Sequence, residues 1–164
     1  MDDWIVHAET ICLRCGGACC HDAHPPVSAS CYERLRKAGV PADSFESAGY
    51  TRLKTKENGE CILIRDGKCS IHAFKPETCR AGPFTFDVKD TVIEIYLKRE
   101  TICPLIPLLK GNPDAYGQLY GQAERSILHL VKHLTGDEIA EICRIEEPET
   151  DLVAVLSKEA GRAV

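Results

Sequence analysis

Four cysteines within nine residues near the N-terminus constrain this chain more than any other feature. They form the pattern C-x-x-C-x-x-x-C-C, made of Cys12, Cys15, Cys19 and Cys20. Thiolates are soft, anionic ligands, so several thiols in one short segment favour a transition metal or an iron-sulfur cluster. Gly16 and Gly17 permit the left-handed turns that point backbone N–H groups toward the sulfurs. The segment predicts a metal site with Cys12 and Cys15 as its first two ligands.

Further cysteines extend this site along the chain. Four more stand beside turn-forming residues, and these are Cys61, Cys69, Cys79 and Cys103. Eight cysteines suffice for two four-thiolate sites, or for one cluster with extra thiols for regulation or catalysis. Side chains of consecutive residues diverge in an extended backbone, so we expect Cys19 and Cys20 to face different places. The N-terminal segment is then half of a composite site.

The cysteine content favours ligation over disulfides. Ten cysteines among 164 residues lie below the ~8 to 10% density of small secreted disulfide scaffolds. A chain of this length builds a core without cross-links. Residues 1–7 lack a basic region and a long apolar run, so we expect neither a signal peptide nor a membrane span. The chain is therefore expected in the cytoplasm, where thiols stay reduced.

Charge and motifs exclude several other classes of function. The formal net charge is -5, from 25 acidic and 20 basic residues, and no basic block stands out. Nucleic-acid binding needs a concentrated basic face, so we expect no nucleic-acid partner. The chain has no G-x-S-x-G elbow, P-loop or dinucleotide fingerprint, which argues against hydrolase, NTPase and dehydrogenase chemistry.

The first half of the chain alternates short elements with loops. Residues 5–11 predict a short helix or an extended lead-in, and a loop carrying the first cysteines follows up to Pro26. Ser28 is the expected N-cap of a helix that ends near Ala38. The strands expected at 50–56 and 60–65 flank Asn-Gly, the strongest short hairpin signal. A second turn at Asp66-Gly67 would place Cys61 and Cys69 close together.

The second half predicts one hairpin and then helices. Residues 84–88 and 91–98 are rich in β-branched side chains around a turn at Lys89-Asp90. Apolar residues recur every three to four positions after Pro113, which predicts the longest helix, ending at Gly136. Asp137 is the expected cap of another helix, and residues 148–160 are expected to form a third. Together these patterns predict a single small α+β domain over residues 1–164, with β-hairpins, cysteine-rich loops and a C-terminal helical segment.

The stretch from Cys69 to Arg80 completes a recognisable series. It reads Cys-Ser-Ile-His-Ala-Phe-Lys-Pro-Glu-Thr-Cys-Arg. With the N-terminal cysteines and Cys61-Ile-Leu, it resembles the CxxCxxCC cysteine-cluster family of zinc- or iron-chelating domains, over about residues 10–107. The resemblance implies metal ligation by the eight cysteines and leaves residues 112–160 as a helical extension.

Two positions depart from the family pattern. His72 stands in place of a tyrosine and Lys75 in place of an arginine, so a tyrosyl hydroxyl or a guanidinium fork is not supplied there. Arg80 matches the pattern. It is the candidate cofactor-binding residue, placed to offset thiolate charge at Cys79, to bind an anionic ligand or to form a surface ion pair.

The same family resembles the cysteine-rich region of the flagellin lysine methylases, which favours iron over zinc but does not extend to methyl transfer. Our first hypothesis is an iron-sulfur protein, of 4Fe-4S type, whose cluster serves redox or substrate-activation chemistry. The second is a zinc-stapled module whose C-terminal helices bind a protein partner. The third is a thiol oxidoreductase that uses Cys19 and Cys20. Whether the chain is an enzyme stays open.

The other cysteines and histidines have simpler interpretations. Cys31 and Cys143 lie on apolar helix faces and are expected to pack as small hydrophobic residues. His129 and His133 share one helix face at i, i+4 spacing, and we expect that face to be solvated.

Three loop histidines lie near the cysteines, namely His21, His24 and His72. Thiols are plentiful, so we expect polar loop roles for them. Among them, His72 is the strongest non-cysteine ligand candidate.

Overall fold

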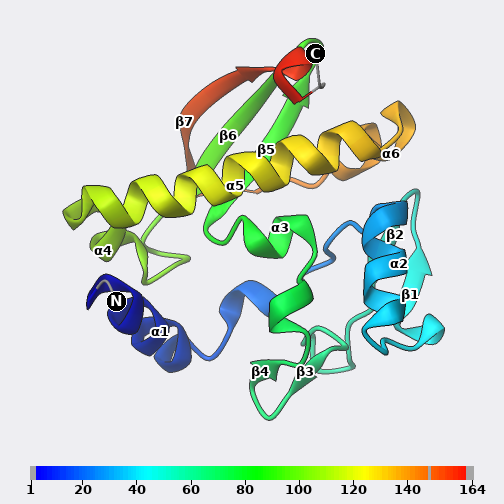
Figure 1. The fold of residues 1–164 in the computed structure, drawn as a ribbon, viewed down its shortest axis with the longest axis horizontal. Helices are drawn as coiled ribbons and strands as arrows, with labels where there is room; N and C mark the ends of the chain where they lie inside the picture. The colour runs from blue at the N-terminus through cyan, green and yellow to red at the C-terminus, as the bar shows by residue number, and fades with distance from the viewer. Residues whose placement is uncertain (1–2, 148, 162–164) are drawn as a thin grey trace.

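The computed structural model describes residues 3–147 and 149–161. Figure 1 shows helices and small sheets mixed along the chain, which confirms the expected α+β class. The α-helices are α1 (Asp3–Cys15), α2 (Ala29–Lys37), α3 (Glu77–Arg80), α4 (Ile106–Gly111), α5 (Pro113–His133) and α6 (Gly136–Ile142). The 3-10 helices are η1 (Ala18–Cys20), η2 (Ala42–Ser44), η3 (His72–Phe74) and η4 (Lys158–Gly161). The strands are β1 (Phe45–Ser47), β2 (Thr51–Leu53), β3 (Ile64–Arg65), β4 (Lys68–Cys69), β5 (Phe84–Lys89), β6 (Val92–Lys98) and β7 (Thr150–Ser157).

The largest sheet has three antiparallel strands in the order β5-β6-β7. β5 and β6 form the predicted hairpin, with Phe84 opposite Leu97. Along β6 every second residue is buried, namely Ile93, Ile95 and Leu97. This alternation is typical of a strand with one face against a core, because successive side chains point to opposite sides of a sheet.

The predicted third C-terminal helix is wrong. Residues 150–157 form β7, which pairs with the second edge of β6, with Ile95 opposite Ala154. Pro148, where the helix was expected to begin, lies outside the described residues. A short isolated helix is marginal in water. The edge of β6 offers backbone N–H and C=O groups that need partners, and a segment rich in Val and Leu satisfies them.

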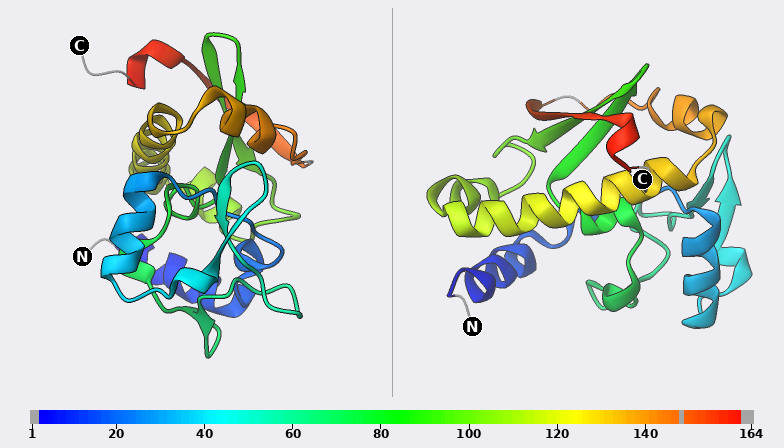
Figure 2. Two further views of the ribbon diagram at one scale, coloured as in Figure 1. Left: turned by 90° about the vertical axis from the view of Figure 1, so that its right-hand side faces the viewer. Right: turned by 45° about the horizontal axis from the view of Figure 1, so that its top comes forward.

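α5 lies across the sheet and closes its core, as Figures 1 and 2 show. The side chain of Asn112 accepts a hydrogen bond from the Ala115 N–H at 3.0 Å, so the helix begins at Pro113 as predicted. Its buried face includes Ala123, Ile127 and Leu130, all fully buried. These residues pack with the inward side chains of β6 into the main apolar cluster.

The junction between α5 and α6 differs from the prediction. α5 ends at His133, and Thr135 rather than Asp137 caps α6. The Glu138 N–H donates to Thr135 Oγ1 at 3.2 Å, and the Thr135 N–H donates to Glu138 Oε1 at 3.2 Å. This reciprocal capping box satisfies two free donors at once, which a single Asp cap does not.

A second apolar cluster lies around α2, β1 and β2. It includes Val27, Leu35 and Leu53, each almost fully buried. Ser28 caps α2 as predicted, because its Oγ accepts a hydrogen bond from the Cys31 N–H at 3.3 Å. The cluster lies apart from the sheet, with α3 between the two in Figures 1 and 2.

The hairpin predicted at 50–56 and 60–65 forms only its turn and the pairs next to it, with the Lys56 N–H donating to the Glu60 carbonyl and the Ile62 N–H to the Lys54 carbonyl. The Gly59 N–H donates to the Lys56 carbonyl at 3.0 Å, but the ladder beyond is reduced to one isolated bridge, Thr55–Cys61. β2 pairs instead with β1. The rings of Tyr32 on α2 and Phe45 on β1 pack edge to face at 4.7 Å, which holds β1 beside β2.

Among the described residues, no helix combines the length and the apolar character needed to cross a membrane.

Candidate metal centre

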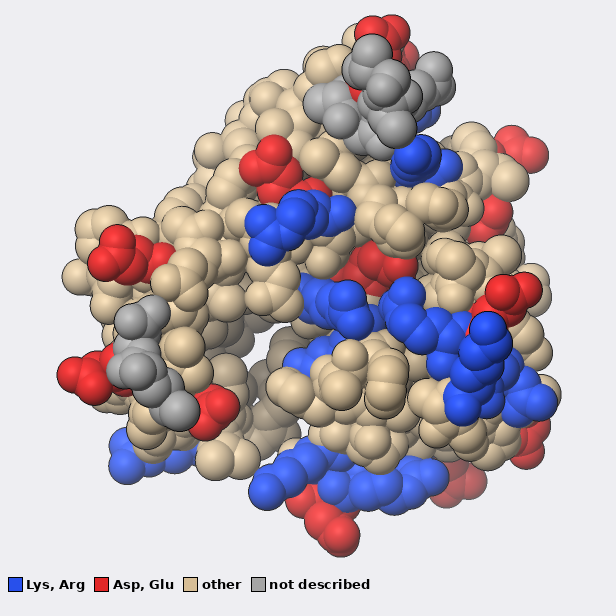
Figure 3. Space-filling view, in the orientation of Figure 1, with Lys and Arg blue, Asp and Glu red and all other residues tan. Residues whose placement is uncertain are grey.

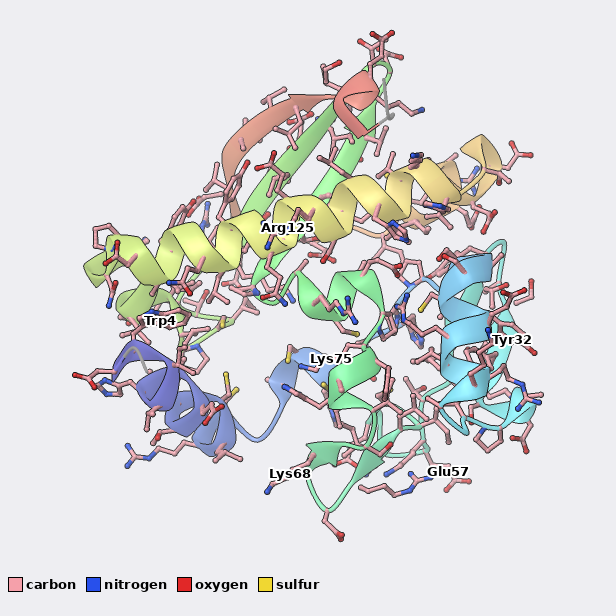
Figure 4. All side chains as sticks on the ribbon, viewed as in Figure 1. Trp4, Tyr32, Glu57, Lys68, Lys75 and Arg125 are labelled. Atoms are coloured by element: carbon pink, nitrogen blue, oxygen red, sulfur yellow. The ribbon has the colours of Figure 1, made fainter. Side chains whose placement is uncertain are left out.

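The eight candidate cysteines come from distant parts of the chain. They stand at the end of α1 (Cys12, Cys15), in η1 (Cys19, Cys20), before β3 (Cys61), in β4 (Cys69), in α3 (Cys79) and after β6 (Cys103). All are free thiols, and none forms a disulfide. In Figure 4, sulfur atoms in yellow lie on both sides of the space between α1 and the centre of the molecule. Figure 3 shows a hollow at this place.

The first two cysteines lie on a helix, not on the predicted loop. α1 continues to Cys15, so Cys12 and Cys15 share one helix face at i, i+3 spacing. Trp4 on the same helix packs against the main apolar cluster, which stabilises α1 beyond what its local sequence indicates. The helix ends where Gly16 and Gly17 adopt positive φ angles of 74° and 77°. The glycines reverse the chain, as expected, and lead into η1.

Cys19 and Cys20 are closer than expected. The backbone at η1 is a 3-10 turn rather than extended, and the two Sγ atoms are 4.0 Å apart. A hydrogen bond from the Cys20 thiol lowers the pKa of Cys19, and the positive charges of Lys98 and Lys75 lower it further. The same hydrogen bond and burial raise the pKa of Cys20. The pair therefore favours one thiolate and one thiol.

The two cysteines nevertheless differ in most of their neighbours, although both interact electrostatically with Cys79. Cys20 interacts electrostatically with Cys79 and Cys61, and the Cys61 N–H donates to the Cys20 carbonyl at 3.0 Å. Burial raises the pKa of the Cys79 thiol to about 12, and the charges of Cys61 and Cys69 act in the same direction. Cys69 lies in β4 opposite Ile64, across the predicted turn. Cys20, Cys61, Cys69 and Cys79 thus form one group, here called the inner group.

The remaining thiols are linked to one another through Cys12 and Cys19. Burial raises the pKa of Cys12, and the charges of Cys19 and Cys15 raise it further. Burial also raises the pKa of Cys103, where the charges of Cys12 and Cys19 contribute in the same direction. Cys12, Cys15, Cys19 and Cys103 form a second group, here called the outer group. The Cys19–Cys20 pair joins the two.

Two lysines lie among the thiols, and sequence reasoning missed their role. Lys75 lowers the pKa of Cys19, and its charge also acts on Cys12 and Cys79. Lys98, the last residue of β6, acts on Cys19 and Cys103. Figure 4 shows Lys75 at the centre of the molecule, beside the sulfur atoms. Lys75 had a sequence signal, because it replaces the family arginine, but nothing local marks Lys98.

The other candidate ligands contribute differently. Arg80 is exposed and donates to the Ala73 carbonyl at 3.3 Å. His72 is exposed, and His24 is half-buried. His21 lines a cavity of about 230 Å³ together with Cys15 and Cys20, next to Glu60. His21 thus shares a cavity with two of the candidate ligands.

Cys31 and Cys143 pack as predicted. Cys31 is fully buried in the second apolar cluster, and Cys143 packs against the main one. His129 and His133 are largely exposed, with ring centroids 4.2 Å apart. The sequence indicated no acidic partner for them, but His129 Nε2 lies 3.6 Å from Glu77 Oε1.

The donor set fits a thiophilic metal. Thiolate sulfur is a ligand of zinc and of iron-sulfur clusters alike. Among residues 3–147 and 149–161, no three His, Cys, Asp or Glu side chains are placed so that they could hold a metal ion together. The thiols are grouped by their charge interactions rather than by a completed coordination shell.

A comparison with protein families matches residues 11–104 to CxxCxxCC, described as "Putative zinc- or iron-chelating domain". The chain belongs to this family. The match contains all eight candidate cysteines and ends before α5, α6 and β7, so this CxxCxxCC protein carries a metal-binding cysteine-rich domain followed by a segment outside the family model. No curated protein and no solved structure matches the chain.

Proposed function

We propose that this protein holds an iron-sulfur cluster, of 4Fe-4S type, through its clustered cysteines. The observation that carries the proposal is that eight free cysteines from six parts of the chain all lie within the family match, and that the charges of several of them act on one another. Iron-sulfur clusters are held almost entirely by cysteine and accept ligands from scattered segments. Ten unpaired cysteines also support a reducing, cytoplasmic location.

We assign the ligands to the two groups defined above. The outer group would hold this cluster and the inner group would offer a second four-thiolate site, with Cys19 belonging to the first and Cys20 to the second. When bound, a cluster would supply reversible one-electron transfer or a Lewis-acidic iron. Lys75 and Lys98 offset the negative charge of the thiolates, which lowers the cost of gathering several anions in one place.

Two alternatives have a specific observation behind them. The family description names zinc beside iron, and with zinc the protein would be a structural module with a protein partner at its C-terminal segment. Thiol oxidoreductase chemistry is favoured by the Cys19–Cys20 pair, because a lowered pKa supplies the attacking thiolate next to a second thiol.

Metal analysis separates the three functions. The protein is purified without oxygen, and its absorption, iron, zinc and acid-labile sulfide are measured. We expect a coloured protein with iron and sulfide in equal amounts. A colourless protein with stoichiometric zinc contradicts the iron-sulfur assignment, and a folded protein without metal supports the thiol oxidoreductase.

Serine substitutions test the ligands. Cys12→Ser or Cys15→Ser is expected to lower bound metal and soluble yield together, because ligand loss and fold loss are coupled. Cys79→Ser is expected to remove the metal of the inner group alone. Cys143→Ser is the matched control and leaves the metal content unchanged. Unchanged metal in Cys15→Ser overturns the assignment of the outer group.

A further inference from the structure

A buried carboxylate stands beside the candidate metal centre. Glu77 is the first residue of α3, and its side chain is only 5% exposed. Neither of its oxygens has a hydrogen-bond partner among the described residues. A buried carboxylate is stable only close to compensating charge. The position of Glu77 therefore depends on the guanidinium group of Arg34 and on the polar imidazole of His129. The pKa of His129 is lowered by burial and by the neighbouring His133.

Two helices supply those groups from opposite sides. Arg34 on α2 places Nη2 4.0 Å from Glu77 Oε1, and His129 on α5 places Nε2 3.6 Å from the same oxygen. Arg34 Nη2 also donates to the Lys75 carbonyl at 3.5 Å and to Cys31 Sγ at 3.5 Å. α2 and α5 thus hold the chain where it enters α3.

α3 carries Cys79 but is too short to be stable alone. Its hydrogen bonds run from the Arg80 N–H to the Pro76 carbonyl at 3.0 Å and from the Ala81 N–H to the Glu77 carbonyl at 2.9 Å. The hydrogen bonds of a single turn do not offset the conformational entropy lost in helix nucleation. Its location is therefore set by its contacts, and α3 packs against α5.

We propose that Glu77, held between Arg34 and His129, is a positioning residue for the Cys79 thiol. Through His129, α5 then supports the metal centre although this helix lies outside the family match. The proposal rests on the proposed metal-binding function. It predicts that weakening the contact on α5 changes the metal centre without removing any thiol.

The test uses cobalt(II) as the probe in the full-length protein. In cobalt-loaded His129→Ala, we expect an altered thiolate-to-cobalt absorption and roughly tenfold faster release to a chelator, the size of effect seen when groups that orient ligands are removed. His129→Gln, which keeps a polar N–H group, restores part of the wild-type release rate. Gln122→Ala, at an exposed position of the same helix, is the control and behaves as wild type. Wild-type absorption and release in His129→Ala overturn the proposal.

If the wild-type protein binds no cobalt, the proposed function is contradicted. A second measurement then tests the positioning role of Glu77 by itself. Amide hydrogen exchange at Arg80 and Ala81 is then compared in the metal-free proteins. Faster exchange in His129→Ala and in Glu77→Gln supports positioning of α3 by this contact. Exchange at the wild-type rate in both variants overturns it. Glu77→Gln keeps the shape of the side chain and serves if His129→Ala does not fold.

Discussion

The sheet region and the cysteine region of this protein are built differently. β5, β6 and β7 have six, seven and eight residues, and α5 covers their apolar face. The four strands of the cysteine region have only two or three residues each. Isolated bridges such as Thr55–Cys61 replace continuous ladders there. The first region is held by apolar burial and backbone pairing.

The cysteine region has few continuous strand ladders, and we expect metal ligation to supply part of the stability that such ladders would give. Its apolar cluster is smaller than that of the sheet region, so less apolar burial is available there to offset the conformational entropy of ordered loops. Metal ligation supplies folding free energy directly in such segments. We infer that the two regions respond to different perturbations, and the following predictions separate them.

Metal removal should give the largest difference between the regions. After treatment with a chelator and reductant, we expect amide exchange to accelerate by at least about tenfold in residues 17–80, because ligand binding and local folding are coupled. Amides of β5 and β6 are expected to keep their protection. Hydrogen-exchange mass spectrometry measures both at once. Equal acceleration in both regions would show that one cooperative unit depends on the metal.

Truncation in the sheet core should destabilise the protein with or without metal. Ile95 is fully buried on β6, so Ile95→Ala removes apolar contacts and leaves a cavity. We expect the free energy of unfolding to fall by ~2–5 kcal/mol. Urea unfolding is measured for metal-loaded and metal-free protein. The exposed Leu152→Ala is the control, with little expected change. If added metal restored the free energy of unfolding that Ile95→Ala loses, the two regions would not be independent, and the prediction would be contradicted.

Alkaline pH should destabilise the metal-free protein, mainly through the cysteine region. Burial raises the pKa of Cys31 and of Cys79 to about 12, from an ordinary thiol value of 9.0. Between these values the folded state keeps protons that the unfolded chain releases, so the free energy of unfolding falls as pH rises from about 9 toward about 12. Below about pH 9 this contribution to stability is fully present.

Thermal melts at about pH 8 and about pH 10 measure this effect. Metal-loaded protein should lose less stability, because a ligated Cys79 has already released its proton. Cys31→Ala should reduce the fall in both forms. A melting temperature that rises between the two pH values contradicts the prediction.

Helix caps give the smallest expected effects. Ser28→Ala on α2 and Thr135→Ala on α6 each remove a side-chain acceptor for a helix N–H group. Each is expected to cost ~0.5–2 kcal/mol in the free energy of unfolding. Only Ser28→Ala should also speed metal release, because α2 carries Arg34. Equal release rates in the two variants would remove α2 from the support of the metal centre.

Local signals in the sequence predicted much of the fold correctly. The β5–β6 hairpin, the start of α5 and the Ser28 cap were all correct, because alternation, proline position and capping act within a few residues. β7 and the β1–β2 pairing were missed. Both depend on which strand edge or aromatic ring lies next to the segment in the folded protein, as Tyr32 lies next to Phe45. The β-propensity of a segment carries no information about such partners.

The sequence by itself determined the chemistry of this protein. The series of cysteines specified a soft-ligand site and the family, because ligand type and spacing are properties of the chain. Only the tertiary structure decided how those thiols divide around Cys19 and Cys20, which lysines stand among them, and that α5 reaches Glu77 beside Cys79. Those arrangements arise from packing between segments far apart in the chain, where distance and burial, rather than residue identity, set the charge on each group.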